Sequence, residues 1–218
     1  MNYSFTRINP NVISGNNLII ETNYVKKKFP TKTIHFPDII VNRGDFITIY
    51  GKSGAGKSTF CQIIVNFMQY DEGKININGI NNNSQNVFEF IHYISQTPDH
   101  NLIGPTCIDD LKLWTMKTDE QINFMATLKE FNLLEQISVP IWKLSFGQKK
   151  ALTFSALKIS EKSIWLIDEP FTGLDSDMMD ILKNCFIEFL QNNGTIIVTT
   201  HMESKILPEI IGNKYYEL

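Results

Sequence analysis

The sequence contains very little arginine. Arg7 and Arg43 are the only two among 20 basic residues, and the 218-residue chain has a formal net charge of -3. Arginine is the side chain best suited to bidentate contacts with phosphates and bases, and a weakly acidic chain does not attract a polyanion. We therefore expect no nucleic-acid partner. Any bound anion must be held by lysine side chains and backbone N–H groups.

Cysteines and long hydrophobic runs are also scarce. Cys61, Cys107 and Cys185 have no metal-ligand spacing, which is typical of small buried residues in a reducing compartment. No apolar run approaches the roughly 18 residues that cross a bilayer, and the N-terminal segment lacks the apolar stretch of a secretory signal. We expect a soluble, cytosolic protein, and these features leave docking on a membrane protein open.

Three short apolar runs alternate with helical patterns. The runs, at 45–51, 163–170 and 194–201, are continuous, which is typical of strands covered on both faces in a parallel sheet. Helical periodicity occupies 57–69, 120–131, 149–159 and 177–190. Shorter strands are expected at 17–22, 33–36, 38–45 and 72–80, and the last of these reaches an Asn-Gly pair that predicts a hairpin. The pattern predicts an α/β fold with an antiparallel β flank.

A glycine-rich segment, "GKSGAGKST" at 51–59, follows the first buried run and precedes the first helical pattern. It matches the P-loop, in which glycines let backbone N–H groups converge on phosphate oxygens at the start of a helix. Lys57 is expected to pair with β- and γ-phosphates, and the Ser58 hydroxyl to ligate Mg²⁺. The alternative is a βα turn with a surface lysine. The predicted ATP-binding residues here are Gly51, Lys52, Ser53, Gly54, Ala55, Gly56, Lys57, Ser58 and Thr59.

Polar side chains end the other two buried runs. Asp168 and Glu169 follow "IWLI", and His201 follows "TIIVTT". Ligands of open α/β sheets bind at the carboxyl ends of the strands, where these residues are expected to lie. Asp168 is predicted to hold Mg²⁺ through water, Glu169 to orient or deprotonate the attacking water, and His201 to face the γ-phosphate. Without the P-loop, these three residues have an alternative interpretation. Asp168 and Glu169 would be a surface acidic pair before a proline turn, and His201 would be a loop histidine.

The heptapeptide "LSFGQKK" at 144–150 has two interpretations. Taken alone, it predicts a helix start in which Ser145 is the N-cap and Gln148 completes a capping box. The free amides at such a helix N-terminus also attract anions. The heptapeptide alone does not decide between a structural cap and an anion site.

The P-loop, Gln96, "LSFGQ", "IWLIDEP", "GLD" and His201 occur in the order and approximate spacing of the ABC-type ATPases, and the resemblance covers nearly the whole chain. It implies a P-loop NTPase core at about 1–95 and 160–218, with a helical subdomain at about 97–158. It also implies that the signature residues act on the ATP of a second, head-to-tail subunit. These residues are Leu144, Ser145, Phe146, Gly147 and Gln148.

The same resemblance implies roles for four further residues. Gln96 would be the Q-loop residue, which bridges Mg²⁺ and the helical subdomain and contributes to catalysis. Asp175 in "FTGLD" would be the D-loop aspartate that crosses the dimer interface. Phe29 stands at the right distance before the P-loop to stack on adenine, with Tyr24 as the alternative. The implied ligands are ATP and Mg²⁺, and the implied partners are a second ABC ATPase subunit and integral membrane transport subunits.

The segment "SQTPDHNLIGPTCIDDLKLW" at 95–114 resembles the energy-coupling-factor importers of vitamins and metal ions. "LSFGQKK", with Phe146 in place of the usual first glycine, points the same way. Termination soon after His201 also occurs in haem-export ATPases and other compact members. A soluble ABC ATPase without a membrane partner, of the iron–sulfur assembly type, stays open. A P-loop kinase or GTPase does not account for the signature.

Overall fold

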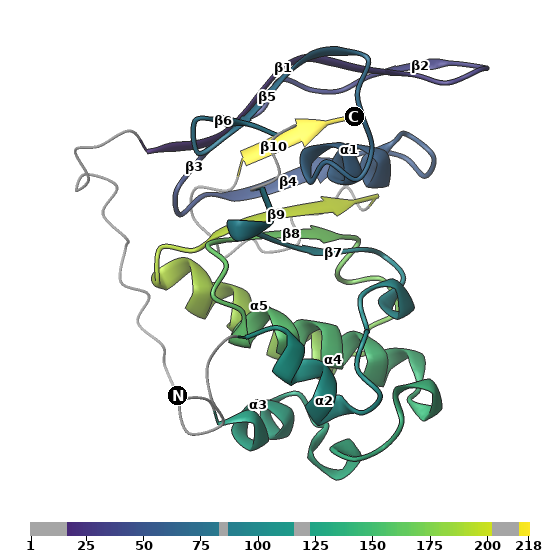
Figure 1. Ribbon diagram of the computed structural model, residues 1–218, viewed down its shortest axis with the longest axis vertical. Coiled ribbons are helices and arrows are strands. Elements are labelled where there is room, and N and C mark those ends of the chain that lie inside the picture. The colour runs from purple at the N-terminus through teal and green to yellow at the C-terminus, as the bar shows by residue number, and fades with distance from the viewer. Residues whose placement is uncertain (1–16, 83–86, 116–122, 202–213) are drawn as a thin grey trace.

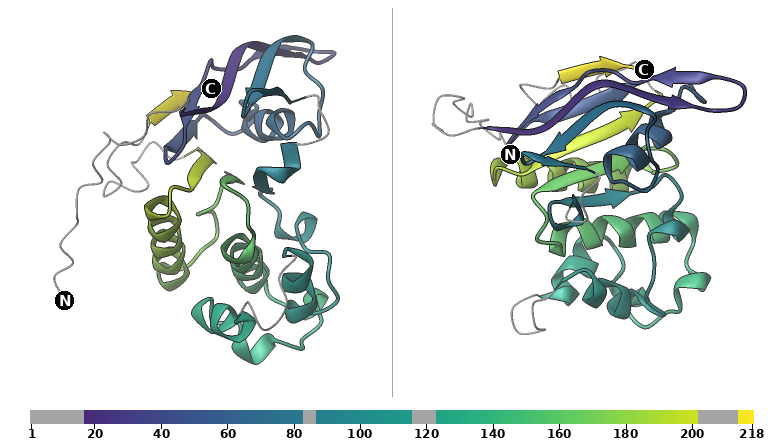
Figure 2. Two further views of the ribbon diagram at one scale, coloured as in Figure 1. Left: turned by 60° about the vertical axis from the view of Figure 1, so that its left-hand side comes forward. Right: turned by 45° about the horizontal axis from the view of Figure 1, so that its top comes forward.

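The computed structural model describes residues 17–82, 87–115, 123–201 and 214–218. Figures 1 and 2 show its layers: an antiparallel sheet with helix α1 (Lys57–Ile64) beneath it, then a parallel sheet, then the remaining helices. One buried apolar cluster joins the two sheets through α1, and a second joins the parallel sheet to the helices. The α/β class with a P-loop NTPase-like core is confirmed.

The parallel sheet has the order β10-β4-β9-β8-β7, and every neighbouring pair is parallel. Its strands are β4 (Phe46–Tyr50), β7 (Ile91–Ile94), β8 (Ile164–Asp168), β9 (Thr195–Thr200) and β10 (Lys214–Glu217). The three predicted apolar runs form the three central strands, and β8 and β9 are buried along their whole length. All strands therefore end at one edge of the sheet.

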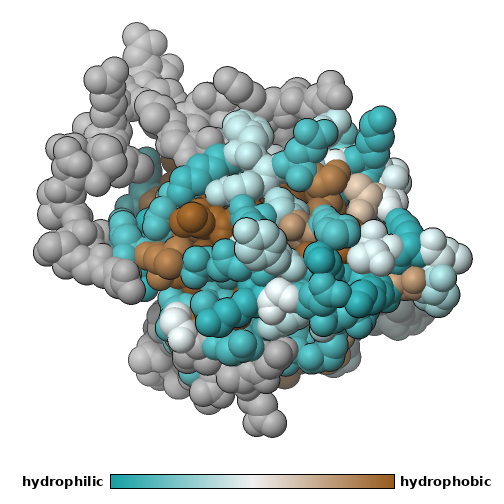
Figure 3. Space-filling model, turned by 90° about the horizontal axis from the view of Figure 1, so that it is seen from above, coloured by the Kyte–Doolittle hydropathy of each residue, from teal (hydrophilic) through white to brown (hydrophobic). Residues whose placement is uncertain are grey.

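The antiparallel sheet is built on the long strand β1 (Leu18–Lys28). This strand pairs with β2 (Thr33–His35), β3 (Ile40–Asn42) and β5 (Glu72–Ile77), and β5 pairs with β6 (Ile80–Asn81). Asn78 and Gly79 both have positive φ, of 50° and 77°, which is the geometry of a two-residue hairpin turn. The predicted hairpin is thus confirmed. Figure 3 views the molecule from the side of the antiparallel sheet, where the surface is largely hydrophilic with scattered apolar residues.

The helices beneath the parallel sheet are α2 (Cys107–Leu113), α3 (Phe124–Glu130), α4 (Phe146–Ile159) and α5 (Ser176–Gln191). Short 3₁₀ turns lie at Val87–Glu89, Pro98–His100, Leu134–Gln136 and Ile141–Lys143. The elements named from Pro98 to Ile159 are all helical, and their separation as a subdomain stays a prediction. Across the described ranges, no helix combines the length and hydrophobicity needed to span a bilayer.

Three helix boundaries differ from those expected by more than one residue. The helix predicted for 57–69 ends at Ile64, because Asn66 adopts a left-handed conformation with φ 59°. The helix expected at 149–159 starts earlier, at Phe146, because Ser145 caps it. For the pattern at 120–131, α3 begins at Phe124, and 120–122 lie outside the described residues.

Candidate phosphate-binding site

Four predicted segments meet at the carboxyl edge of the parallel sheet. The P-loop follows β4, Glu169 follows β8, His201 follows β9 and Gln96 lies two residues after β7. They border an open cavity of about 400 Å³. Its lining consists of Phe29, Lys32, Ile34, Ser53, Gly54, Gly56, Lys57, Ser58, Thr59, Gln96, Glu169 and His201.

The P-loop has the backbone geometry that a phosphate cradle requires. Gly54 and Gly56 have positive φ angles of 79° and 117°, which glycine adopts without strain. Gly56 is the N-cap of α1, and no side chain caps this helix. The N-terminal amides of α1 are therefore available to an anion, and the helix dipole favours negative charge at this point.

Lys57 is buried at the centre of the site. Its Nζ donates to the carbonyl oxygens of Gly51 at 2.8 Å and Lys52 at 3.2 Å, and lies 3.3 Å from Glu169 Oε1. The Lys57 side chain is 7% exposed and that of Glu169 8%, so this ion pair is poorly screened by water. The Glu169 carboxylate is thus the acidic partner of the Lys57 charge.

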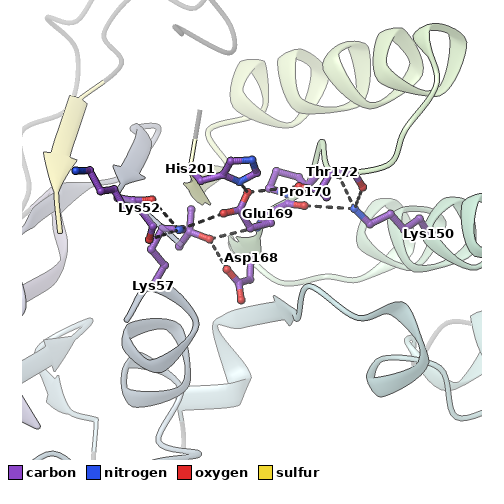
Figure 4. Close-up of polar contacts among 10 residues, drawn as sticks. Lys52, Lys57, Lys150, Asp168, Glu169, Pro170, Thr172 and His201 are labelled. Atoms are coloured by element: carbon purple, nitrogen blue, oxygen red, sulfur yellow. Dashed lines mark hydrogen bonds and ion pairs between the residues drawn. The ribbon is translucent and has the colours of Figure 1, made fainter. Parts of the chain in front are cut away.

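Glu169 joins the P-loop to His201. Its second carboxylate oxygen, Oε2, lies 2.9 Å from His201 Nδ1, and Figure 4 shows Glu169 between the Lys57 and His201 side chains. Glu169 has a left-handed backbone, with φ 50°, and its N–H donates to Thr199 O and Thr199 Oγ1, both at 3.2 Å. The turn directly after β8 therefore directs this carboxylate into the cavity.

Asp168 and Gln96 differ in their access to the cavity. Asp168 is 2% exposed, accepts a hydrogen bond from Thr199 Oγ1 of the neighbouring strand, and is not among the lining residues. Gln96 is a lining residue, as is Ser58. Amide, hydroxyl and carboxylate oxygens are the ligands that Mg²⁺ prefers, and a position set back from the cavity suits the water-mediated contact predicted for Asp168.

The two candidates for the adenine contact are separated by the structure. Phe29 lines the cavity, at the end of β1. Tyr24 is 77% exposed, is not among the lining residues, and its backbone N–H donates to Asp38 Oδ1 at 2.6 Å. The geometry favours Phe29 over Tyr24.

Two residues that line the cavity near Phe29 were not identified from the sequence. Lys32 and Ile34 line the cavity, and Lys32 Nζ donates to Gly54 O at 3.2 Å. Ile34 packs on Gly56, where a Cβ would come within 3.0 Å of the Ile34 side chain. Lys32 could have been predicted as a residue of the site from its position, because it is a basic residue three positions after Phe29.

The signature segment lies at the N-terminus of α4 and contributes no lining residue to this cavity. The predicted capping box is present: Gln148 N–H donates to Ser145 Oγ at 3.2 Å, and Ser145 N–H donates to Gln148 Oε1 at 2.9 Å. Leu144 is buried, whereas Ser145, Phe146 and Gly147 are exposed. Asp175 caps α5 by accepting from Met178 N–H at 2.8 Å.

Lys150, one turn into α4, is a further residue that sequence reasoning did not place at the site. It is 4% exposed, and its Nζ donates to carbonyl oxygens of the segment that contains Glu169. Burial lowers the pKa of Lys150 to about 8, against the opposing effect of the Glu169 and Asp168 carboxylates. Nothing in the sequence around Lys150 indicates that this lysine is buried.

Comparison with known proteins agrees with the geometry. Residues 36–172 match the ABC transporter family. The cytochrome c biogenesis ATP-binding export protein CcmA of Pasteurella multocida is 27% identical over 185 residues, which make up 82% of this chain and 86% of that protein. A putative ABC transporter ATP-binding protein of Lactobacillus johnsonii is 35% identical over 174 residues, covering 74% of this chain and 29% of that protein.

Among solved structures, cbiO1 from Clostridium perfringens, part of the ABC transporter complex cbiONQ, superposes with a TM-score of 0.69 and 25% identity. The match covers 86% of this chain and 80% of that one. The chain therefore belongs to the ABC transporter family of ATP-binding proteins, whose members are ATPases. The chain spans less than a third of the Lactobacillus johnsonii relative.

Proposed function

We propose that this chain binds and hydrolyses ATP, dimerises head to tail, and energises the transport of a solute across a membrane. The observation that carries the proposal is the meeting of Lys57, Glu169 and His201 in a cavity bordered by an uncapped helix N-terminus. A buried lysine and a buried glutamate beside free helix amides suit a site for phosphoryl chemistry.

ATP binding is assigned to the P-loop and the β1–β2 wall. The amides of residues 51–59 would hold the phosphates, and the Lys57 ammonium would exchange Glu169 for β- and γ-phosphate oxygens. Phe29, on the β1 side of the cavity, would stack on the adenine. Mg²⁺, held by Ser58 and Gln96 with Asp168 acting through water, would neutralise phosphate charge.

Hydrolysis is assigned to Glu169 with His201. Once the phosphates hold Lys57, the Glu169 carboxylate is free to orient a water molecule or accept its proton. The His201 ring, 2.9 Å from Glu169 Oε2, would fix the direction of that carboxylate and face the γ-phosphate. Leu144–Gln148 and Asp175 would act across the dimer interface, where the N-terminus of α4 offers its amides to the partner's ATP.

For the transported solute, two classes remain candidates. The 95–114 segment and the likeness to cbiO1 support an importer of the energy-coupling-factor type. The CcmA relative, which this chain covers over 86% of its length, supports a small exporter such as a haem exporter. Either would place the chain on the cytoplasmic face of the membrane, bound to integral membrane subunits and a second ATPase subunit.

Affinity purification of the tagged chain from detergent-solubilised native membranes tests the transport assignment. Recovery with multi-span membrane proteins is expected. Recovery with soluble iron–sulfur assembly proteins alone would favour the ABC ATPase without a membrane partner. In a deletion strain, loss of growth at low external vitamin or metal indicates an importer, whereas loss of haem attachment to cytochrome c indicates the exporter.

Lys57→Ala is expected to weaken ATP binding at least about tenfold, because charge-assisted hydrogen bonds to phosphate are lost and no other buried cation lines the described cavity. Calorimetric titration with Mg²⁺ and ATP measures the affinity. Lys74→Ala, an exposed lysine of β5, is the matched control. Because Lys57→Ala leaves the buried Glu169 without its partner, thermal unfolding is recorded in parallel. Unchanged affinity in a folded Lys57→Ala protein contradicts the assignment.

Phe29→Ala is expected to weaken ATP binding by about 5- to 150-fold, the range of one base–aromatic stack. Tyr24→Ala should have little effect, because Tyr24 is not part of the cavity wall. Inorganic triphosphate carries no base, so its affinity should be equal for Phe29→Ala and the unaltered protein. A larger loss in Tyr24→Ala than in Phe29→Ala would reverse the assignment of the adenine contact.

A further inference from the structure

The Lys150 side chain connects the signature helix to the turn that carries Glu169. From α4, its Nζ donates to Glu169 O at 3.3 Å, Pro170 O at 3.2 Å and Thr172 O at 2.6 Å. Figure 4 shows the side chain pointing from α4 toward this turn, with its nitrogen beside Thr172. An ammonium group has three protons, so each has a carbonyl acceptor. Among the described residues, no carboxylate lies within ion-pair distance of this ammonium.

The turn that accepts these bonds has weak backbone bonds of its own. Thr172 N–H reaches Glu169 O at 3.4 Å, and Leu174 N–H reaches Phe171 O at the same distance of 3.4 Å. Glu169 also has a left-handed backbone, a conformation that persists only where the surroundings fix it. The Glu169 backbone is fixed by hydrogen bonds on both sides. Its N–H donates to Thr199 Oγ1, and its carbonyl oxygen accepts from Lys150 Nζ.

The start of α4 packs on the same turn. The Phe146 ring centroid is 5.7 Å from Lys150 Nζ. Gly173 has φ 74°, and a Cβ placed there would come within 3.2 Å of the Phe146 ring. The start of α4 and residues 169–173 thus lie close together within one chain, through the hydrogen bonds of Lys150 and the approach of the Phe146 ring to Gly173.

We propose that Lys150 is a positioning residue for ATP hydrolysis, which holds the 169–172 turn so that Glu169 faces the phosphates and ties that turn to the signature helix. This inference rests on the proposed role of Glu169 in hydrolysis. Lys150 does not line the cavity, so its effect on the reaction is exerted through Glu169 and not through the nucleotide.

The test compares Lys150→Met with Lys158→Met in the full chain. Both changes remove a lysine ammonium from α4, but Lys158 binds the exposed Glu130 and Glu188, away from the cavity. Lys150→Met is expected to lower kcat by about 10- to 100-fold, as for other residues that orient a reacting group. ATP affinity should change less than about twofold, and Lys158→Met should retain normal turnover.

A cycle with Glu169→Gln separates positioning from general damage to the fold. If Lys150 acts through Glu169, Lys150→Met should cause no further loss in the Glu169→Gln protein, measured by single-turnover hydrolysis of labelled ATP. Normal kcat in Lys150→Met, or an equal loss in both backgrounds, overturns the inference. If Lys150→Met does not fold, Lys150→Gln, which keeps two donor protons, replaces it in the same cycle.

The proposed function and this inference fail in different ways. Absence of ATP turnover in the unaltered chain, or turnover unaffected by Glu169→Gln, contradicts the assignment of hydrolysis itself. Turnover that depends on Glu169 and is indifferent to Lys150 leaves the proposed function standing and removes Lys150 from it.

Discussion

Glu169→Gln is expected to reduce ATP turnover by at least about 100-fold, because general-base catalysis contributes that much or more. ATP binding should be preserved, since Glu169 acts in the chemical step. The structure adds a second expectation. Glu169 Oε1 lies 3.3 Å from Lys57 Nζ, so the Glu169 carboxylate and a phosphate would compete for the same lysine charge. Glutamine removes that competition, so ATP affinity should equal or exceed that of the unaltered chain.

Two measurements check this result. Calorimetry gives the ATP affinity, and sedimentation with Mg²⁺ and ATP detects the nucleotide-bound dimer that slow hydrolysis should trap. Glu135→Gln makes the same chemical change at an exposed position in the Leu134–Gln136 turn and should behave as the unaltered chain. Turnover close to normal in Glu169→Gln removes Glu169 from the catalytic role. Weaker ATP binding contradicts the competition for Lys57.

The parts of the fold that the sequence predicted are those governed by local rules. β8 and β9 appear as continuous apolar runs because both of their faces are covered. The hairpin at Asn78 and Gly79 follows from the backbone preferences of those two residues. The P-loop and the carboxyl ends of the parallel strands were enough to predict that Lys57, Glu169 and His201 approach one another.

Other features depend on packing between distant segments. Strand β7 was not predicted, because its four residues include His92, which is buried and stacks on Trp114 with a centroid distance of 4.3 Å. Burial lowers the pKa of His92 to about 3, so this histidine behaves as an uncharged aromatic residue. Lys150 was missed for the same reason, since backbone carbonyls 19 to 22 positions away satisfy its charge.

The ion pair between Lys57 and Glu169 was also beyond sequence reasoning. The sequence pattern assigned Lys57 to the phosphates and Glu169 to the attacking water, and it gave no reason to pair the two residues. In the structure, these two buried charges neutralise each other across a distance of 3.3 Å. Isolated charges at this depth are unfavourable, so the pairing follows from burial. Sequence motifs indicate the chemistry of a site, whereas the contacts between its own side chains depend on how they pack.

Ser145→Arg is expected to leave ATP binding by the single chain largely unchanged and to abolish ATP-dependent dimerisation and turnover. Within the described residues, Ser145 Oγ accepts from Gln148 N–H at 3.2 Å, and no signature residue lines the cavity. A purely structural cap therefore predicts a stability loss of about 1 kcal/mol and normal catalysis. If the segment completes a partner's site, an arginine there fills the space of the partner's γ-phosphate and blocks close approach.

The matched control is Asn123→Arg. Asn123 caps α3 by accepting from Ala126 N–H at 2.9 Å, so this change also exchanges an N-cap for arginine. It should lower thermal stability by a similar amount and leave dimerisation and turnover intact. A loss of dimerisation in both variants would attribute the Ser145→Arg effect to helix capping.

Mixing Ser145→Arg with Lys57→Ala chains tests the arrangement of the two halves directly. In a head-to-tail heterodimer, one composite site carries both lesions and the other carries neither. The doubly altered site binds ATP weakly, because its P-loop lacks Lys57. The arginine that replaces Ser145 can therefore occupy the space of the missing γ-phosphate. The dimer can then close around the intact site. The mixture should therefore hydrolyse ATP faster than either variant alone at the same total protein concentration, as measured by ATPase assays, and sedimentation should detect the heterodimer. Normal dimerisation and turnover of Ser145→Arg by itself, or no recovery from two folded variants, contradicts the action of "LSFGQ" on a partner's nucleotide.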